Sequence, residues 1–497
     1  MTHSLKQDDW IHFVAVGGTA MGALAGYFKE NNYCVTGSDK ALYSPMKEYL
    51  LNDKKVDVKI PFQKNNLIAK TWNIKNKTHP DVIIIGNAVS AHFEEALEAE
   101  KLRAEYNVKI YSFAEAVSEF LIQDKTCFVC SGTHGKSTTS SILSYSLEQL
   151  SQQPGFFVGA ILANFRQSLR AAKGDYFAIE GDEYDTAYWD KGSKFLHYKP
   201  AWTICTGIEF DHADIFNDID DILKTFQKLA HSTQKGLVLV DERSVPEDMV
   251  DVLKRYKNLL PDELKVVRYG KASDSDYQLL SYKYEQDKKA QKVKFSYQDK
   301  DYVYFLPMSG EHNILNSLAV VAALNEEGVA SLEDILNSFQ GYLGLKRRQE
   351  VLFEENNRVL IDDFAHHPTA IKETINAMKQ KYPDFIIHAF FEARSATSSR
   401  NIFFEQYLNC FNQADKIYFS EPTKDNIPEE EKLETQELIN QIKSNGLDII
   451  GSSDVNELLL KFKKNLNSKK HLALIMSNGP FSGIHQKIKS IFEKETA

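Results

Sequence analysis

The sequence predicts an α/β fold in three domains: a Rossmann-like N-terminal domain, a central P-loop ATPase-like domain and a C-terminal Rossmann-like domain. Three observations predict this fold. Short apolar runs alternate with segments of helical periodicity along most of the chain. Several of these runs end in turns rich in glycine, asparagine or acidic residues, as strands do in parallel sheets that bind nucleotides. The 497 residues also exceed what one hydrophobic core usually organises, so several domains are expected.

The composition favours a globular cytoplasmic protein that binds neither nucleic acid nor membranes. The chain has 59 basic and 69 acidic residues, and its net charge of -10 disfavours nonspecific attraction to phosphate backbones. No apolar run approaches the ~20 residues needed to span a bilayer, and the N-terminus lacks the apolar stretch of a signal peptide. Cys127 and Cys130 form a C-x-x-C, but residues three apart on a strand point to opposite faces. That spacing disfavours zinc or redox chemistry there.

The first segment, residues 1–123, begins with a strand–turn–helix pattern of the kind that binds dinucleotides. Apolar Phe13–Val16 leads into a glycine-rich turn and then into the helical pattern Ala23–Asn31. The turn does not meet the G-x-G-x-x-G order, so a purely structural role in packing is equally open. Two further strands, Tyr33–Thr36 and Asp81–Ile85, end in turns that would line the same crevice. The candidate ligand contacts in these three turns are Gly17, Gly18, Thr19, Met21, Gly22, Ser38, Asp39, Asn87 and Ala88.

The second segment, residues 124–343, holds the most informative pattern of the chain. The apolar run Thr126–Cys130 precedes Gly132-Thr133-His134-Gly135-Lys136-Ser137-Thr138, and a helical pattern follows. This order is typical of a strand, a phosphate-binding turn and a helix. Backbone N–H groups would converge on phosphate oxygens, Lys136 would reach the outer phosphates and Ser137 would ligate magnesium. A general P-loop would have glycine where this chain has Cys130. The alternative is an ordinary glycine- and serine-rich turn before a helix.

Two acidic clusters follow the next two predicted strands of this segment. Tyr176–Ile179 leads into a cluster that starts at Glu180, and Trp202–Cys205 leads into one that contains His212. A parallel sheet would bring both clusters to the same edge as the phosphate loop, where carboxylates suit magnesium. The alternative is that these acidic residues only populate exposed loops. The lysine-rich stretch Tyr282–Asp301 has the alternation of a surface hairpin without chemistry.

The third segment, residues 344–497, follows the glycine-rich linker Gly341–Gly344 and alternates strands and helices again. Strand Arg358–Asp362 leads into Asp363-Phe364-Ala365-His366-His367-Pro368, where the proline suits the first turn of the next helix. Further strands are predicted at Phe385–Phe391, Ile417–Ser420 and Leu472–Met476. The turns after the first and the last of these contain Arg394, Ser395 and Asn478.

These motifs, in this order, resemble the Mur ligase superfamily, whose ATP-dependent enzymes add amino acids or peptides to UDP-N-acetylmuramate. The phosphate loop matches the family pattern G-T-x-G-K-[ST]-T, including the missing early glycine. Glu180 matches the family's metal-binding glutamate, and His212 matches its histidine. Gly310–Asn316 matches the family's adenine-contacting element. Arg347-Arg348 matches its paired arginines, and Asp362–Pro368 matches its D-D-Y-x-H-H-P element. The resemblance covers essentially the whole chain.

The resemblance implies an amide ligase of peptidoglycan metabolism that uses ATP and Mg²⁺. ATP would phosphorylate a carboxylate of the sugar nucleotide, an amine would attack the acyl phosphate, and domain closure would exclude water. Catalytic roles are implied for Lys136, Glu180, His212, Arg348 and Asp363, with Ser137, Glu180 and His212 as metal ligands. ATP would contact the phosphate loop and Asn313, Asn316, Arg348 and Asp363, and the N-terminal turns would hold the UDP-sugar. Peptide contacts are implied for His366, His367, Arg394, Ser395 and Asn478.

Two roles stay open for several of these residues. His366 and His367 could assist deprotonation of the amine, or they could cap the following helix. A paired arginine such as Arg347-Arg348 is otherwise more often a surface or salt-bridge feature.

Within the superfamily, two kinds of member start from the free sugar acid: one adds L-alanine and the other adds the tripeptide L-alanyl-γ-D-glutamyl-meso-diaminopimelate during peptidoglycan recycling. This chain is more similar to the second kind in Tyr184–Phe195, Phe210–Phe216, Glu392–Thr397 and Met476–Lys487. It departs from that kind at Ala393, where proline is usual, and in its less glycine-rich first turn. The alternatives are the L-alanine ligase, a catalytically silent nucleotide-binding regulator and, less favoured, a dinucleotide oxidoreductase. Monomer and homodimer stay equally open, as do diaminopimelate and lysine at the third peptide position.

Overall fold

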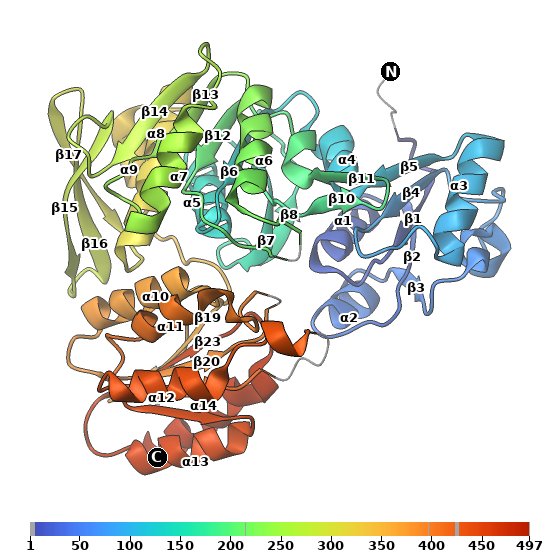
Figure 1. Ribbon diagram of the computed structural model, residues 1–497. Helices are drawn as coiled ribbons and strands as arrows, with labels where there is room; N and C mark the ends of the chain where they lie inside the picture. The colour runs from blue at the N-terminus through green and yellow to red at the C-terminus, as the bar shows by residue number, and fades with distance from the viewer. Residues whose placement is uncertain (1–4, 214, 396, 423–426, 497) are drawn as a thin grey trace.

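Three α/β domains make up the computed structural model, which describes residues 5–213, 215–395, 397–422 and 427–496 (Figure 1). In Figure 1 the central domain lies at the upper left, the N-terminal domain to its right and the C-terminal domain beneath it. Each of the three large sheets falls inside one of the predicted segments. We therefore keep residues 1–123, 124–343 and 344–497 as the proposed domain limits.

The N-terminal domain is a five-stranded parallel sheet in the order β3-β2-β1-β4-β5. This is the order of the Rossmann fold, which places strand carboxyl ends at one ligand-binding edge. Its strands are β1 (Trp10–Val14), β2 (Cys34–Ser38), β3 (Asp57–Lys59), β4 (Val82–Ile85) and β5 (Lys109–Ser112). Its helices are α1 (Thr19–Glu30), α2 (Met46–Glu48), α3 (Glu94–Tyr106) and α4 (Phe113–Val117), which continues as a π turn through Ile122.

Several features of this domain differ from the prediction, among them β2, which runs to Ser38 and not to Thr36. The first strand ends at Val14 and not at Val16, because Ala15 has a φ of +68° and the N–H groups of Ala15 and Val16 both donate to Ser38 O. β3 and β5 were not predicted. Both are short and mix polar residues with apolar ones, so neither has a periodicity that reveals a strand.

The central domain is a ten-stranded sheet in the order β17-β16-β15-β14-β13-β12-β6-β9-β7-β8. Its strands are β6 (Thr126–Ser131), β7 (Gly155–Leu162), β8 (Gln167–Arg170), β9 (Tyr176–Glu180), β12 (Trp202–Cys205), β13 (Gly236–Val240), β14 (Lys265–Gly270), β15 (Tyr277–Glu285), β16 (Ala290–Tyr297) and β17 (Lys300–Leu306). Its helices are α5 (Lys136–Gln149), α6 (Ile219–Ser232), α7 (Glu247–Lys257), α8 (Glu311–Glu327) and α9 (Leu332–Asn337). The antiparallel meander β15–β17 confirms the hairpin predicted at Tyr282–Asp301.

β6 lies in the middle of this sheet and is buried on both faces. Cys127 belongs to one buried cluster and Cys130 to another, which confirms that the C-x-x-C residues point to opposite faces. The cluster around Cys127 also contains Phe28 of α1 and Phe113 of α4. The N-terminal and central domains therefore share a hydrophobic contact through α1 and α4.

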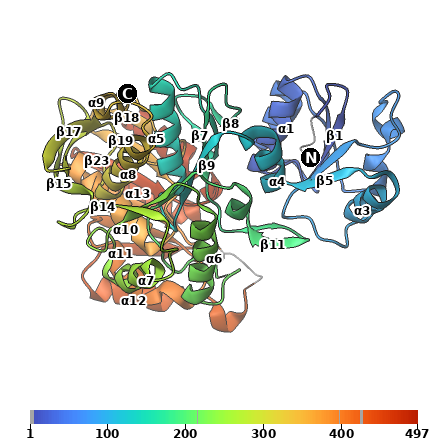
Figure 2. The ribbon, with the colours of Figure 1, turned by 90° about the horizontal axis from the view of Figure 1, so that it is seen from above.

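A separate two-stranded hairpin, β10 (Asp185–Ala187) and β11 (Asp190–Ser193), leaves the central domain and extends toward the N-terminal domain (Figure 2).

The C-terminal domain is a six-stranded sheet in the order β18-β19-β23-β20-β21-β22, with only β18 antiparallel. Its strands are β18 (Glu350–Glu355), β19 (Arg358–Asp363), β20 (Ile386–Glu392), β21 (Lys416–Ser420), β22 (Ile449–Ser452) and β23 (His471–Met476). Its helices are α10 (Pro368–Lys381), α11 (Phe404–Cys410), α12 (Thr435–Ser444), α13 (Val455–Asn465) and α14 (Ile484–Thr496). Pro368 occupies the first turn of α10, as predicted. Among the residues that the structure describes, no helix combines the length and apolarity that crossing a bilayer requires.

Candidate active site

The predicted phosphate loop joins β6 to α5, which confirms the strand–turn–helix order. Two of its residues, Gly132 and Gly135, have φ angles of +124° and +85°, a conformation that favours glycine. A Cβ on Gly132 would lie 2.3 Å from Thr206 Oγ1, and one on Gly135 would lie 2.6 Å from Asn316 Oδ1. The two glycines therefore let the loop pack directly against the end of β12 and the first turn of α8.

A cleft of about 1090 Å³ opens over this loop, between the central and C-terminal domains. Ligand-binding clefts usually measure roughly 300–1,000 Å³, so this one is large enough for a nucleotide and part of a second ligand. The central domain contributes Lys136, Glu180, His212 and Asn316 to its lining, and the C-terminal segment contributes Arg348 and His366. These residues lie far apart in the sequence, where only the family pattern connected them, and the structure brings them into one cleft.

Lys136 is held across the phosphate loop by three acceptors. Its Nζ donates to Gly132 O at 2.7 Å, to Thr133 O at 3.2 Å and to Glu183 Oε1 at 2.9 Å. Burial opposes the charge on this side chain, but the nearby Glu183 carboxylate raises the pKa of Lys136, so the side chain is cationic. Glu183 was not predicted as a site residue. It lies in the predicted acidic cluster after β9, but sequence order does not tell which acidic residue of a cluster faces the lysine.

Ser137 and Glu180 form a hydroxyl–carboxylate pair in the cleft. Ser137 Oγ donates to Glu180 Oε1 at 2.9 Å, and the other carboxylate oxygen accepts from Gly159 N–H at 2.8 Å. His212 lines the same cleft, and its ring lies 4.7 Å from that of Tyr184. Hydroxyl and carboxylate oxygens are the donors that magnesium prefers. The chemistry of Ser137 and Glu180 therefore fits the predicted ion.

Glu209 links the phosphate loop to the C-terminal domain. Its Oε2 lies 2.8 Å from His134 Nε2 in the loop, and its Oε1 accepts from Thr369 Oγ1 of α10 at 3.0 Å. His367 Nδ1 lies 3.7 Å from Glu209 and accepts the N–H of Thr369 at 3.3 Å. Burial, reinforced by His134, lowers the pKa of His367 to about 4. His367 is therefore a neutral helix cap, which is one of the two roles that the sequence left open.

His134, Glu209 and His367 present ligand atoms that all lie within 4.8 Å of one another, so this group could hold a metal ion. His367 Nδ1, however, already accepts the N–H of Thr369 at 3.3 Å. Glu209 is also already hydrogen-bonded to His134 and Thr369. We interpret the group as a hydrogen-bonded contact between the two domains. Glu209 was not predicted as a site residue, although it stands in the predicted acidic cluster after β12.

Arg348 and Asp363 line the cleft on the side of the C-terminal domain. Both carboxylate oxygens of Asp363 accept backbone N–H groups, from Gln349 and Ala365, each at 2.8 Å. Burial raises the pKa of Asp363, and the Arg348 guanidinium partly offsets this. Arg348 stacks over the ring of Phe364 at 4.9 Å from its centroid. Asp363 thus shapes the turn that carries Arg348, and the cationic group faces the cleft.

The two predicted adenine contacts lie in the first turns of α8. Asn313 is buried, and its side-chain amide donates to Ser309 O at 2.7 Å. Asn316 lies beside Gly135 of the phosphate loop. Both residues also line the cleft. The structure therefore brings the predicted adenine contacts and the phosphate loop to one cleft.

The predicted contacts of the sugar nucleotide gather at the carboxyl ends of β1, β2 and β4. The N–H of Gly17 donates to Asp39 Oδ2 at 2.7 Å and joins the first turn to the second. The exposed members of these turns are Gly18, Thr19, Asn87 and Ala88. Three other predicted members are interior, namely Met21, Gly22 and Ser38. Ser38 donates to Glu95 inside the domain, and a side chain on Gly22 would overlap α2, so these two residues serve packing in this structure.

The predicted peptide contacts fall into two groups. His366 and His367 line the cleft. Arg394, Ser395 and Asn478 follow the neighbouring strands β20 and β23 and are not among the lining residues. The Arg394 side chain is half exposed, and Asn478 Oδ1 is buried without a hydrogen-bond partner among the described residues. The second group thus lies at the carboxyl ends of β20 and β23, outside the lining of the cleft, and Arg394 lies 3.7 Å from Glu392.

Three family profiles match successive parts of the chain. Residues 10–124 match the profile described as Mur ligase family, catalytic domain. Residues 130–324 match the Mur ligase middle domain, and residues 347–479 match the Mur ligase glutamate ligase domain. These three matches follow the three sheets in order.

Curated proteins and solved structures agree with these profiles. The chain is 32% identical, over 96% of its length and 98% of the relative, to the UDP-N-acetylmuramate–L-alanyl-γ-D-glutamyl-meso-2,6-diaminoheptandioate ligase of Haemophilus influenzae. It is 30% identical, over 92% of each chain, to the UDP-N-acetylmuramate–L-alanine ligase of Ligilactobacillus salivarius. Its fold is similar to the crystal structure of a murein peptide ligase from Psychrobacter arcticus, with a TM-score of 0.66, 26% identity and coverage of 97% and 98%.

Proposed function

The chain belongs to the Mur ligase family, and from this premise we propose that it joins UDP-N-acetylmuramate to the tripeptide L-alanyl-γ-D-glutamyl-meso-diaminopimelate at the cost of ATP. The observation that carries the proposal is the shared cleft, where Lys136, Ser137 and Glu180 of the central domain face Arg348 and His366. Because the tripeptide is a fragment of peptidoglycan, the reaction would serve peptidoglycan recycling. Because the reaction consumes ATP, we expect it to take place in the cytoplasm.

The first step makes the carboxyl carbon of the sugar acid electrophilic. A carboxylate oxygen attacks the γ-phosphorus of ATP, the bond to the β-phosphate oxygen breaks, and ADP leaves behind an acyl phosphate. Negative charge on the phosphate oxygens would be stabilised by Lys136, which is buried and cationic, and by Arg348 from the facing domain. Magnesium, held by Ser137, Glu180 and His212, would supply further positive charge to these oxygens.

The second step forms the amide. The amine nitrogen of the tripeptide attacks the acyl carbon, the bond to the phosphate oxygen breaks, and the amine loses a proton. Water must be kept away from the acyl phosphate, and the contact from Glu209 to Thr369 holds the two domains together over the cleft. His366, whose pKa is lowered by burial, is neutral and donates to Phe364 O at 3.0 Å. We leave the general base unassigned.

The choice of tripeptide over L-alanine is supported by similarity to the relative from Haemophilus influenzae along 96% of the chain. The half-exposed Arg394 also supports it, because a guanidinium binds carboxylates in a bidentate manner and the tripeptide carries several. The L-alanine ligase is the second candidate, since a relative with that name is 30% identical.

A substrate panel tests the proposal. Purified protein with ATP, Mg²⁺ and UDP-N-acetylmuramate is offered the tripeptide, L-alanine or no amine, and release of ADP is followed. Release that depends on both the sugar acid and the tripeptide supports the proposal. A preference for L-alanine would overturn the tripeptide assignment, and no release with either amine would favour a silent nucleotide-binding protein. Replacing diaminopimelate by lysine in the peptide reports the preference at the third position.

A further inference from the structure

The hairpin β10–β11 has an unusual turn. Ala187 pairs with Asp190, so only Tyr188 and Trp189 remain between the strands. Two-residue hairpin turns favour glycine, asparagine and aspartate, because their backbone angles suit small side chains. Two large rings at the tip of an isolated hairpin would also expose apolar surface to water. Turn formation alone therefore does not explain why Tyr188 and Trp189 occupy this turn.

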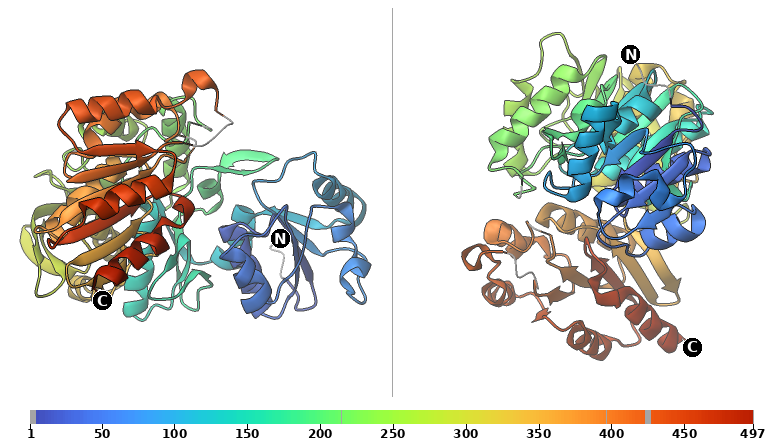
Figure 3. Two further views of the ribbon diagram at one scale, coloured as in Figure 1. Left: turned by 90° about the horizontal axis from the view of Figure 1, so that it is seen from below. Right: turned by 90° about the vertical axis from the view of Figure 1, so that its right-hand side faces the viewer.

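The N-terminal domain covers both rings. Figures 1 and 2 show the hairpin crossing from the central domain to the N-terminal domain, and the left view in Figure 3 shows the same crossing from below. The two rings meet edge to face, with centroids 4.7 Å apart, and pack against a buried cluster that contains Ala15 and Val89. Tyr188 also donates its hydroxyl hydrogen to Glu100 Oε1 of α3 at 2.9 Å. The tip is thus docked by both apolar packing and one hydrogen bond.

The cluster that the rings pack against extends to the predicted sugar-nucleotide turns. Ala15 stands two residues before Gly17, and Val89 directly follows Ala88. Both cluster members therefore flank the sheet edge where we expect the ligand. A displacement of the hairpin tip would move this edge relative to the central domain.

The other end of the hairpin is tied to the phosphate loop. Ser193 Oγ donates to Glu183 O at 2.6 Å, and Lys194 pairs with Asp182 at 2.7 Å. Glu183 in turn pairs with Lys136 at 2.9 Å. The hairpin thus connects the lysine of the phosphate loop to the ligand-bearing edge of the N-terminal domain.

The hairpin adds to another contact between these domains, in which Ser118 also donates to His197 O at 2.8 Å. This other contact is the cluster shared by α1, α4 and the central sheet. It fixes one region of the interface, and rotation of the N-terminal domain about it would pull α3 away from the hairpin tip. The hairpin tip, with its own hydrogen bond to α3, therefore restricts the orientation of the N-terminal domain further.

We propose that Tyr188 and Trp189 are positioning residues, through which the hairpin sets the orientation of the N-terminal domain and aligns the sugar acid with the γ-phosphate of ATP. This inference rests on the proposed ligase function. Reacting atoms must come within about 3 Å of each other, and a misplacement of about 1 Å costs on the order of 100-fold in rate. Loss of the docking contact therefore lowers turnover while the phosphate loop still binds ATP.

The test is the double variant Tyr188→Ala/Trp189→Ala in the full-length protein. We measure kcat and KM for UDP-N-acetylmuramate, the Kd of ATP without sugar, and the thermal unfolding temperature. The expected result is a kcat lowered by about 10-fold or more, with the Kd of ATP and the unfolding temperature close to those of the wild type. A kcat within twofold of the wild type would overturn the inference. A parallel loss of ATP affinity and thermal stability would overturn it too, because it would indicate a merely structural role.

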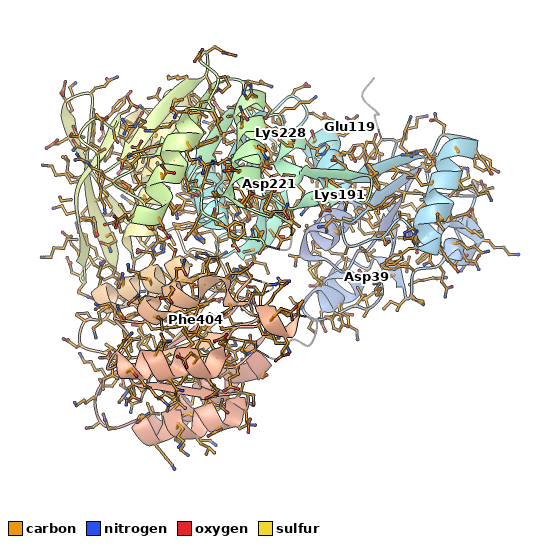
Figure 4. All side chains as sticks on the ribbon, in the orientation of Figure 1. Asp39, Glu119, Lys191, Asp221, Lys228 and Phe404 are labelled. Atoms are coloured by element: carbon orange, nitrogen blue, oxygen red, sulfur yellow. The ribbon has the colours of Figure 1, made fainter. Side chains whose placement is uncertain are left out.

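Three further variants separate the docking contact from general effects. Glu100→Gln keeps an oxygen acceptor for Tyr188 and should retain turnover, whereas Glu100→Ala should lower turnover. Equal turnover in the two variants would contradict a role for the hydrogen bond. Lys191, labelled in Figure 4, lies on the same hairpin with 71% of its side chain exposed, so Lys191→Ala is the matched control. If the wild type itself shows no tripeptide-dependent release of ADP, the proposed function fails. If the wild type is active and the double variant matches it, only this inference fails.

Discussion

Removing the lysine of the phosphate loop has two separable consequences, because Lys136 both faces the cleft and pairs with a buried carboxylate. The Lys136→Met variant should lose about 100- to 1,000-fold in turnover, the usual cost of removing a positioned charge from a transition state. It also leaves Glu183, whose side chain is only 4% exposed, without its cation. Breaking a buried pair in this way costs about 3–5 kcal/mol, which corresponds to roughly 10 °C in the unfolding temperature of a domain of this size. A loss of activity in this variant alone could therefore reflect unfolding.

The double variant Lys136→Met/Glu183→Gln separates the two consequences. The neutral amide removes the buried charge, so the unfolding temperature should return to within a few degrees of the wild type. Turnover should stay as low as in the single variant, because the charge that Lys136 places at the outer phosphates is still missing. Thermal unfolding followed by circular dichroism and release of ADP with sugar acid and tripeptide are the two measurements, and Glu183→Gln alone is the control. Recovery of turnover in the double variant, or near-normal turnover in Lys136→Met, would refute a catalytic role for Lys136.

Three more predictions concern the loop, the domain contact and a buried histidine. Gly135→Ala should weaken ATP binding by about 10-fold or more in equilibrium titration, because a φ of +85° costs an L-residue roughly 1–3 kcal/mol and the new Cβ would meet Asn316. Glu209→Ala should enlarge the radius of gyration in small-angle scattering and lower kcat, because the domains lose the hydrogen bond to Thr369. Glu209→Gln keeps an acceptor, so its radius of gyration and its kcat should lie between those of Glu209→Ala and the wild type. Burial lowers the pKa of His388 to about 3. The free energy of unfolding should therefore be highest above pH 6.5 and fall by roughly 4 kcal/mol as the pH drops toward 3, because only the unfolded chain binds the proton in that range. His388→Gln should flatten this pH dependence in urea titrations.

Each of these has a result that contradicts it. Unchanged ATP affinity in Gly135→Ala would mean that the loop relaxes around the new side chain. Identical scattering from wild type and Glu209→Ala would show that other contacts hold the domains together. A pH dependence of His388→Gln that matches the wild type would assign the acid sensitivity to other groups.

Local patterns in the sequence were sufficient for the elements that carry the site. The strand before Gly132, the helix after Lys136 and the helix that starts at Pro368 are each determined by residues within one or two turns of chain. The strands β9 and β12 were likewise readable from short apolar runs. Parallel strands bring their carboxyl ends to one edge, so the proximity of Glu180 to the phosphate loop followed from topology.

Pairings between distant residues were not predictable in the same way. Lys136 pairs with Glu183 and not with any other acidic residue of its cluster, although all of them stand close together in the sequence. Glu209 reaches Thr369 across 160 residues of chain. Such contacts depend on how the domains sit against one another, which no local periodicity encodes.

The sequence by itself therefore determined a nucleotide-binding α/β chain with a phosphate loop and acidic groups beside it, because short-range sterics and hydrophobic periodicity dictate strands, turns and helices. Only the tertiary structure decided the partner of each charged side chain, the docking of the Tyr188–Trp189 turn and the position of Arg394 outside the lining of the cleft. The physical reason is that charges and rings far apart in the chain become neighbours only after the domains have packed, and their energies depend on that burial.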